Sequence, residues 1–201
     1  MIKTIKLKSI IITICIFFII FLIFYYKNFL FGNNIIKNRD RIENKILSNF
    51  QNYIAEIEVT VNSNKTSNSY IINQEVNDKY SMQEVKNDDN VKIELEGNTL
   101  KISNSKLNKE KVYENYSDLM NDNLFLDTFA RDYKNEENDK EFYEKNNEII
   151  LEVQLNQSRN TYINKKILYV NRETLKPTKL EIKDNTNNET ICIIYNNVEF
   201  K

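Results

Sequence analysis

The chain begins with a long, uninterrupted hydrophobic run. Ser9–Tyr26 reads SIIITICIFFIIFLIFYY and contains no charged side chain, and Lys3, Lys6 and Lys8 precede it. A stretch of about 17 residues rises about 25 Å as an α-helix, just enough to cross the hydrocarbon core of a bilayer. Nothing later in the sequence resembles this run, so we expect a single membrane-spanning helix.

The residues around the run favour an anchor that is not cleaved. A signal peptidase needs small side chains just before its cut, and the flank Phe24–Gly32 offers no such site. Cys15 suggests lipidation, but most of the apolar run follows it, so we interpret it as a small hydrophobic residue within the membrane. The basic residues before the run favour a cytoplasmic N-terminus. We therefore expect an anchor over residues 1–32 and an extracytoplasmic domain over residues 33–201.

After the anchor, the spacing of apolar residues predicts a helix and then strands. Apolar residues recur at helical spacing in Asn33–Asn52. We interpret this segment as a helix that packs on its own domain; the alternative is a helix on the membrane surface. From Tyr53 the period changes to two, as in a half-buried strand over Tyr53–Asn62. Further strands are predicted at 69–76, 79–85, 91–95 and 99–102, the last two joined by a turn at Gly97–Asn98.

The alternating pattern breaks between Ser105 and Glu141, where residues 117–134 favour a second helix. Strands resume at 149–155, 162–170, 178–183 and 189–195. About ten antiparallel strands result, with two helices available to cover their apolar face. The predicted fold class is therefore α+β: a strongly curved antiparallel β-sheet, or half-barrel, that covers two helices behind one N-terminal transmembrane helix.

Composition narrows the classes of function. Lys and Arg number 28 against 29 Asp and Glu, and the resulting net charge of −1 argues against a nucleic-acid binder. The chain has no histidine, which excludes catalytic triads and zinc sites that use His. Its two glycines are too few for a Gly-rich phosphate loop. Cys192 lies in an apolar strand, and we interpret it as a buried, inert thiol.

Carboxylates are the remaining route to catalysis. Glu56 and Glu58 share one face of a predicted strand, as do Glu94 and Glu96. Paired carboxylates can hydrolyse glycosides, but these alternate with apolar positions as ordinary solvent-facing residues do. We therefore expect no enzyme, no metal and no cofactor.

The order of elements and the C-terminal motifs resemble a known superfamily. Leu175–Ile182 reads LKPTKLEI, and the closing strand Ile194–Phe200 reads IYNNVEF. With the helix, the Tyr-led strand and the aromatic central helix, this pattern is similar to the LolA/LolB-like lipoprotein carriers. Size, one N-terminal membrane signal and composition further resemble the clostridial spore germination lipoprotein GerS family, which is itself LolA-like. This chain differs from that family where a lipobox cysteine is expected, so the transmembrane helix would serve as the anchor.

The resemblance implies both a partner and a cavity. The GerS family implies a non-enzymatic partner of a peptidoglycan amidase that processes the spore cortex. LolA-type carriers hold acyl chains between the half-barrel and its lid. The equivalent wall and lid here would be Val59, Val61, Ile93, Leu95, Phe125, Phe129 and Tyr133. The alternative is that these side chains simply fill the core.

We thus expect a membrane-anchored, extracytoplasmic interaction protein that supports an envelope or spore-cortex peptidoglycan amidase. Contact through the sheet surface or an edge strand is expected, with homodimerisation as a further option. The alternative function is a carrier-like protein that binds a lipid or lipoprotein.

Overall fold

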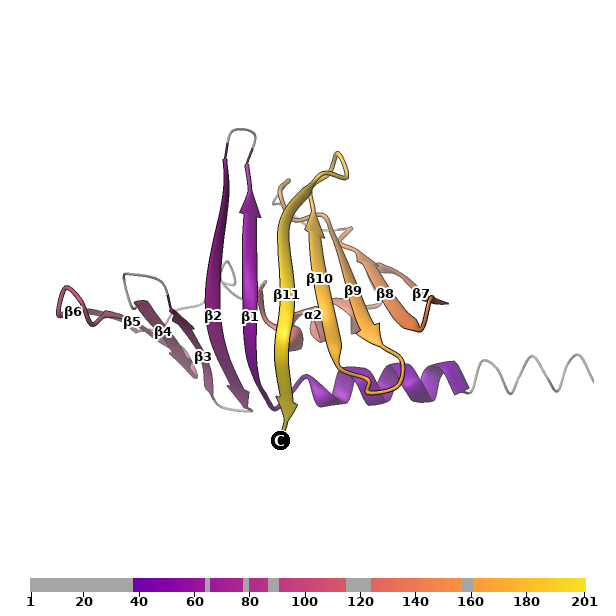
Figure 1. The fold of residues 1–201 in the computed structure, drawn as a ribbon, viewed down its shortest axis with the longest axis horizontal. Helices are drawn as coiled ribbons and strands as arrows, with labels where there is room; N and C mark the ends of the chain where they lie inside the picture. Colours follow the sequence, from indigo (N-terminus) through magenta and orange to yellow (C-terminus); the bar gives the residue numbers. More distant parts are fainter. Residues whose placement is uncertain (1–37, 64–65, 78–79, 87–90, 115–123, 157–160) are drawn as a thin grey trace, which may run out of the picture. The chain divides into compact units, whose positions relative to one another are not determined.

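The computed structural model describes residues 38–63, 66–77, 80–86, 91–114, 124–156 and 161–201 (Figure 1). The chain divides into two compact units, Met1–Lys45 and Ile46–Lys201, and the second unit carries the sheet. The predicted membrane run Ser9–Tyr26, together with Cys15, lies outside the described residues. Within the described ranges, no helix is long and apolar enough to cross a membrane.

Eleven strands form one open sheet in the order β6-β5-β4-β3-β2-β1-β11-β10-β9-β8-β7 (Figure 1). Every neighbouring pair is antiparallel. The first six strands follow one another as hairpins, as do the last five, and the pairing of β1 with β11 joins the two halves. The bounds are β1 Tyr53–Asn62, β2 Ser67–Asn77, β3 Tyr80–Val85, β4 Val91–Glu96, β5 Thr99–Asn104, β6 Lys109–Tyr113, β7 Asp139–Lys145, β8 Glu148–Gln154, β9 Lys165–Asn171, β10 Pro177–Lys183 and β11 Glu189–Phe200.

One face of the sheet, here called the inner face, packs against helix α2 (Leu126–Lys134). The Tyr133 hydroxyl donates to the Glu141 carbonyl on β7 at 3.2 Å. On β9, the buried ammonium group of Lys166 lies 2.6 Å from the Asp132 carboxylate of α2. The Leu126 amide also bonds to Tyr53 on β1, so α2 contacts strands from both halves of the sheet.

Buried polar groups fix the start of α2 on β1 and β2. The Leu126 amide donates to the Tyr53 hydroxyl at 3.1 Å, and that hydroxyl donates to Gln74 Oε1 at 3.3 Å. Gln74 Nε2 in turn donates to the Leu124 carbonyl at 3.1 Å. Each of these groups would otherwise be buried without a partner, so the network specifies where the helix begins.

The helix that we predicted over residues 33–52 is described from residue 38 to residue 49. Ile46, Leu47 and Phe50, which belong to the compact unit of the sheet, are buried there. The ring of Phe50 lies 6.3 Å from that of Phe200 on β11, centroid to centroid. The apolar spacing therefore correctly predicted the part of this helix that packs on the sheet.

The alternating pattern predicts most strands correctly. The buried residues of β1 are Tyr53, Ala55, Ile57 and Val59, and the Gly97–Asn98 turn joins β4 to β5 with Gly97 at φ 56°. The open antiparallel sheet and its covering helix are thus confirmed, whereas the strong curvature of a half-barrel stays a prediction.

Three expectations about elements need correction. Residues 105–141 contain β6 and the start of β7, two strands that we did not predict; the described residues form eleven strands, close to the expected ten or so. The strand expected over 162–170 begins only at Lys165. The second helix begins at Leu126, and the part expected at 117–123 lies outside the described residues.

Candidate functional site

An open cleft of about 800 Å³ lies where β1 ends and β11 begins; we call it the end cleft. Val61 and Ile191 face each other across these two strands. Tyr162 and Ile163 close the cleft from the segment that precedes β9. The remaining lining residues are Asn62, Ser63, Asp184, Asn188, Glu189 and Thr190.

Hydrogen bonds from the sheet hold the Tyr162–Ile163 wall in place. The Thr190 hydroxyl lies 2.9 Å from the Tyr162 carbonyl and 3.1 Å from the Ile182 carbonyl. The Asn164 amide donates to the Lys183 carbonyl at 2.8 Å. The wall is therefore fastened to the ends of β10 and β11 on both sides of Ile163.

The turn Asp184–Asn188 closes one side of the end cleft. The Asp184 carboxylate accepts hydrogen bonds from the Thr186 amide at 2.9 Å, the Thr186 hydroxyl at 2.8 Å and the Asn188 amide at 2.8 Å. These bonds, above all the one from Thr186, lower the pKa of Asp184 below its ordinary value. The turn therefore contributes an ionised carboxylate to the lining of the cleft.

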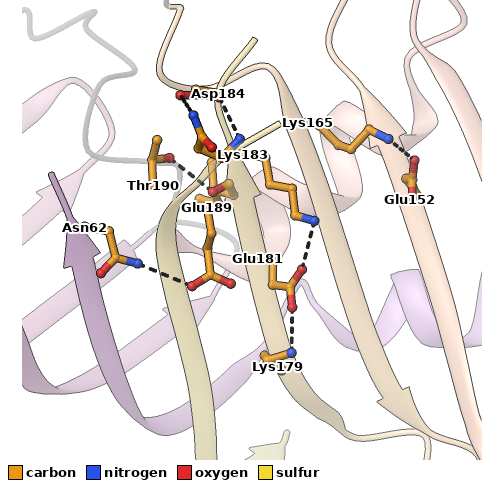
Figure 2. Close-up of polar contacts among 11 residues, drawn as sticks. Asn62, Glu152, Lys165, Lys179, Glu181, Lys183, Asp184, Glu189 and Thr190 are labelled. Atoms are coloured by element: carbon orange, nitrogen blue, oxygen red, sulfur yellow. Dashed lines mark hydrogen bonds and ion pairs between the residues drawn. The ribbon is translucent and has the colours of Figure 1, made fainter. Parts of the chain in front are cut away.

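The end cleft combines an apolar floor with an acidic rim. Val61 is 40% exposed and Tyr162 is 70% exposed, so apolar and aromatic surface faces solvent. Glu189 Oε1 accepts a hydrogen bond from Asn62 Nδ2 at 3.3 Å, as Figure 2 shows. No lysine or arginine is among the described residues that line the cleft. The charge of these described lining residues is therefore negative.

A ladder of paired charges lies on β8, β9 and β10 (Figure 2). Its residues alternate with Lys166, which faces α2, so the ladder lies on the opposite face, here called the outer face. Glu181 on β10 contacts Lys179 at 2.6 Å and Lys183 at 3.5 Å, and Lys165 pairs with Glu152 on neighbouring strands. The hydrogen bond that Lys179 donates to Glu181 raises the pKa of Lys179. Because each of these charges has an opposite partner, we assign the ladder a structural role.

The four glutamates considered for catalysis lie on β1 and β4. Glu56 pairs with Lys86 at 2.5 Å, and Glu94 pairs with Lys92 at 2.8 Å. Lys92 lowers the pKa of Glu94, so this carboxylate is not poised as a general acid. Among the described residues, no group of three or more Cys, Asp or Glu side chains could hold a metal ion.

The residues predicted to form a cavity lie in three places. Val61 lines the end cleft. Ile93 and Leu95 are half-buried on β4, at register positions on the inner face. The buried members, on β1 and on or beside α2, are Val59, Phe125, Phe129 and Tyr133. The structure thus does not bring all seven residues together around the end cleft.

Several lining residues of the end cleft escaped the sequence reasoning. We expected Tyr162 inside a strand and gave Glu189 and Thr190 no role. Their positions depend on hydrogen bonds between segments far apart in the chain, such as the one that joins Asn62 to Glu189. The one signal in the sequence was the aromatic Tyr162 beside the apolar Ile163, after the polar segment 156–161.

The chain also shows a clear family relationship. A family described as sporulation protein YdcC-like matches residues 7–201. The chain belongs to the YdcC-like sporulation protein family. No curated protein matches this chain significantly.

Solved structures of similar fold support the architecture. A chain in the structure of the CwlD amidase from Clostridioides difficile in complex with the GerS lipoprotein has a TM-score of 0.52 and 23% identity, covering 84% of this chain and 95% of that one. An uncharacterized conserved protein from Thermus thermophilus has a TM-score of 0.51 and 7% identity, covering 81% and 86%. A LolA superfamily protein from Nitrosomonas europaea has a TM-score of 0.39 and 11% identity, covering 79% and 93%. At these identities, the first two matches establish a shared fold.

Proposed function

We propose that this YdcC-like protein is a membrane-anchored, extracytoplasmic interaction protein that binds a peptidoglycan amidase of the envelope or spore cortex. Membership of a sporulation family supports the setting. The similar fold found in the structure of an amidase–lipoprotein complex supports the class of partner. The uncharged run Ser9–Tyr26 supports the anchor.

The observation that carries the proposal is the placement of the aromatic residues of α2. Phe129 and Tyr133 are fully buried, with ring centroids 5.8 Å apart, so they fill the interior of the sheet domain. The apolar surface that remains open lies at the end cleft and on the strands. Such a domain suits binding at its surface, and we assign it no catalytic role.

The proposal is tested by isolating the full-length chain, tagged at its C-terminus, from detergent-solubilised membranes of sporulating cells. An amidase is expected to co-purify in near-equal amounts. The matched control is the same tagged chain isolated from vegetative cells. Absence of any amidase from the sporulating sample, with the bait intact and folded, would refute this function.

A second candidate function is the binding of a lipid or lipoprotein. The half-buried Ile93, Leu95 and Ile102 lie at inner-face positions of β4 and β5, beyond the strands that α2 contacts. In that case Val59, Val61, Ile93 and Leu95 would line the ligand site, and Phe125, Phe129 and Tyr133 would form its lid. Native mass spectrometry of the membrane-extracted protein distinguishes this function, since a bound acyl chain adds a discrete mass.

A further inference from the structure

We propose that the end cleft binds a polypeptide segment of a protein partner in which an apolar side chain lies next to a lysine or arginine. This inference rests on the proposed interaction function and names the surface and the chemistry of contact. The occupant is a protein segment because the rim is acidic, and the same acidic rim disfavours the phosphates of anionic lipids and nucleic acids.

The first argument is the abrupt change of burial along β1. Tyr53, Ala55, Ile57 and Val59 are buried on the inner face, at 0–2% exposure, whereas Val61 on the same face is 40% exposed. Tyr70 on β2, which pairs with Val59 on β1, is 38% exposed. The Leu126 amide of α2 bonds to Tyr53, and Leu124, just before α2, bonds to Gln74 on β2; both bonds lie near the opposite end of β1. The described residues thus leave an apolar surface open at the end cleft, and burial of such surface by a partner is favourable.

The second argument is charge. Asp184 and Glu189 contribute two carboxylates to the lining, and the described lining residues include no cation. Lys183 pairs with Glu189 across β10 and β11, but its ammonium group is directed to Glu181 at 3.5 Å on the outer face (Figure 2). A carboxylate has several lone pairs, so Glu189 can keep its bond from Asn62 and still accept an ammonium or guanidinium group.

The third argument is that the walls are already in place. Thr190 fixes the Tyr162 carbonyl, and three hydrogen bonds to its carboxylate fix the Asp184 turn. Ordering mobile loops on binding lowers affinity, and here that loss is small. The volume of about 800 Å³ falls in the range of about 300–1,000 Å³ that is usual for binding sites.

The absence of tryptophan from the chain makes a direct test possible. Full-length protein in non-ionic detergent is titrated into the peptide acetyl-Lys-Trp-Lys-Leu-Lys-amide. Excitation at the red edge of the indole band, where the chain's tyrosines do not absorb, gives emission from the peptide alone. We expect a saturable blue shift for this peptide and none for the matched peptide acetyl-Glu-Trp-Glu-Leu-Glu-amide. Micelles without protein provide the blank.

Three variants locate the binding. Glu189→Gln and Val61→Ser are each expected to weaken binding of the cationic peptide about five- to tenfold. Glu189→Gln removes a negative charge from the rim, and Val61→Ser removes apolar surface from the floor. Glu136→Gln, an exposed glutamate in the turn after α2, is the matched control and is expected to bind like the parent. Urea unfolding confirms that all three variants are folded.

Equal binding of the two peptides, or unchanged affinity in both cleft variants, overturns the proposal. The assay contains no amidase, so its failure leaves the proposed function intact, and that function is tested separately by co-purification. Loss of amidase co-purification in Glu189→Gln and Val61→Ser, but not in Glu136→Gln, would indicate that the amidase binds at the end cleft.

Discussion

At the scale of single residues, two buried tyrosines on the inner face differ in how their hydroxyl groups are satisfied. Tyr53 accepts a hydrogen bond from Leu126 and donates one to Gln74. The hydroxyl of Tyr195, on β11, is also buried, but has no hydrogen-bond partner among the described residues. The same chemical change at the two positions should therefore have different consequences.

Tyr53→Phe is expected to lower the free energy of unfolding by about 1–3 kcal/mol, because it leaves the buried Leu126 amide and Gln74 side chain without their partner. Tyr195→Phe is the matched control and should change stability at neutral pH by less than about 0.5 kcal/mol. Urea denaturation at pH 7 measures both. Equal losses in the two variants would contradict this account.

Lys166 is fully buried, and its ammonium group lies 2.6 Å from Asp132. Asp132→Asn removes the opposite charge but keeps the shape, and we expect it to lower the free energy of unfolding by about 2–4 kcal/mol. Lys166→Met should cost less, because methionine leaves no ammonium group in the interior. The order of the two variants in urea denaturation checks the prediction, and the reverse order would contradict it.

The buried tyrosines also predict how stability depends on pH. Burial raises the pKa of Tyr53 and of Tyr195 above the ordinary value of 10.0, and burial with the hydrogen bond to Glu94 raises that of Tyr80 to about 12. When folding raises the pKa of a tyrosine, the folded state holds the phenol proton more tightly than the unfolded state does. The stabilisation is complete below pH 10.0 and is lost as pH rises through the folded pKa values.

We therefore expect the free energy of unfolding to fall steadily above about pH 10. Urea denaturation at a series of alkaline pH values measures this fall. Tyr195→Phe removes one of the responsible hydroxyl groups and should make the fall shallower. A profile identical to that of the parent chain would rule out a contribution from Tyr195.

At the scale of elements, the strength of the sequence pattern follows from how each strand is buried. β1 lies in the middle of the sheet, with one face covered and one open, so its apolar and polar residues alternate and its bounds are predicted correctly. β6 and β7 lie at the two edges of the sheet, and nearly all their residues are exposed. Neither face of an edge strand needs to be apolar, so the alternation disappears and sequence reasoning misses both strands.

The end cleft was hard to predict for a different reason. Val61 was recognisable as part of an apolar face, because it continues the alternation of β1. Tyr162 joins the cleft through a bond from Thr190 on β11, and Glu189 through a bond from Asn62 on β1; local sequence carries no record of such contacts. Charged side chains are informative here only after the register of the strands is known.

The turn between β7 and β8 allows a prediction about a single element. Asn146 and Asn147 have φ values of 50° and 63°, and Lys145 pairs with Glu148 across this two-residue loop. A β-branched residue is strained in that conformation, so Asn146→Val should lower the free energy of unfolding by about 1–2 kcal/mol. Asn146→Gly should be tolerated and is the control. Equal stability of the two variants in urea would contradict the assignment of this turn.

At the scale of the whole molecule, the sheet depends on the pairing of the first strand with the last. β11 is the final strand in the sequence, yet it lies between β1 and β10. A chain that stops after Lys183 would lack the strand that connects the two halves. We expect it to show no cooperative unfolding transition by circular dichroism, whereas a chain lacking only Lys201 should unfold like the parent.

This connectivity has a consequence for biogenesis. During synthesis β1 emerges early, but one of its edges has no neighbour until the closing 12 residues of β11 arrive. Pairing between strands so far apart in the sequence is slow, and a strand edge that has not yet paired is prone to aggregate. The sheet should therefore complete its fold only once β11 has emerged, and the unpaired edge of β1 should be open to aggregation until then.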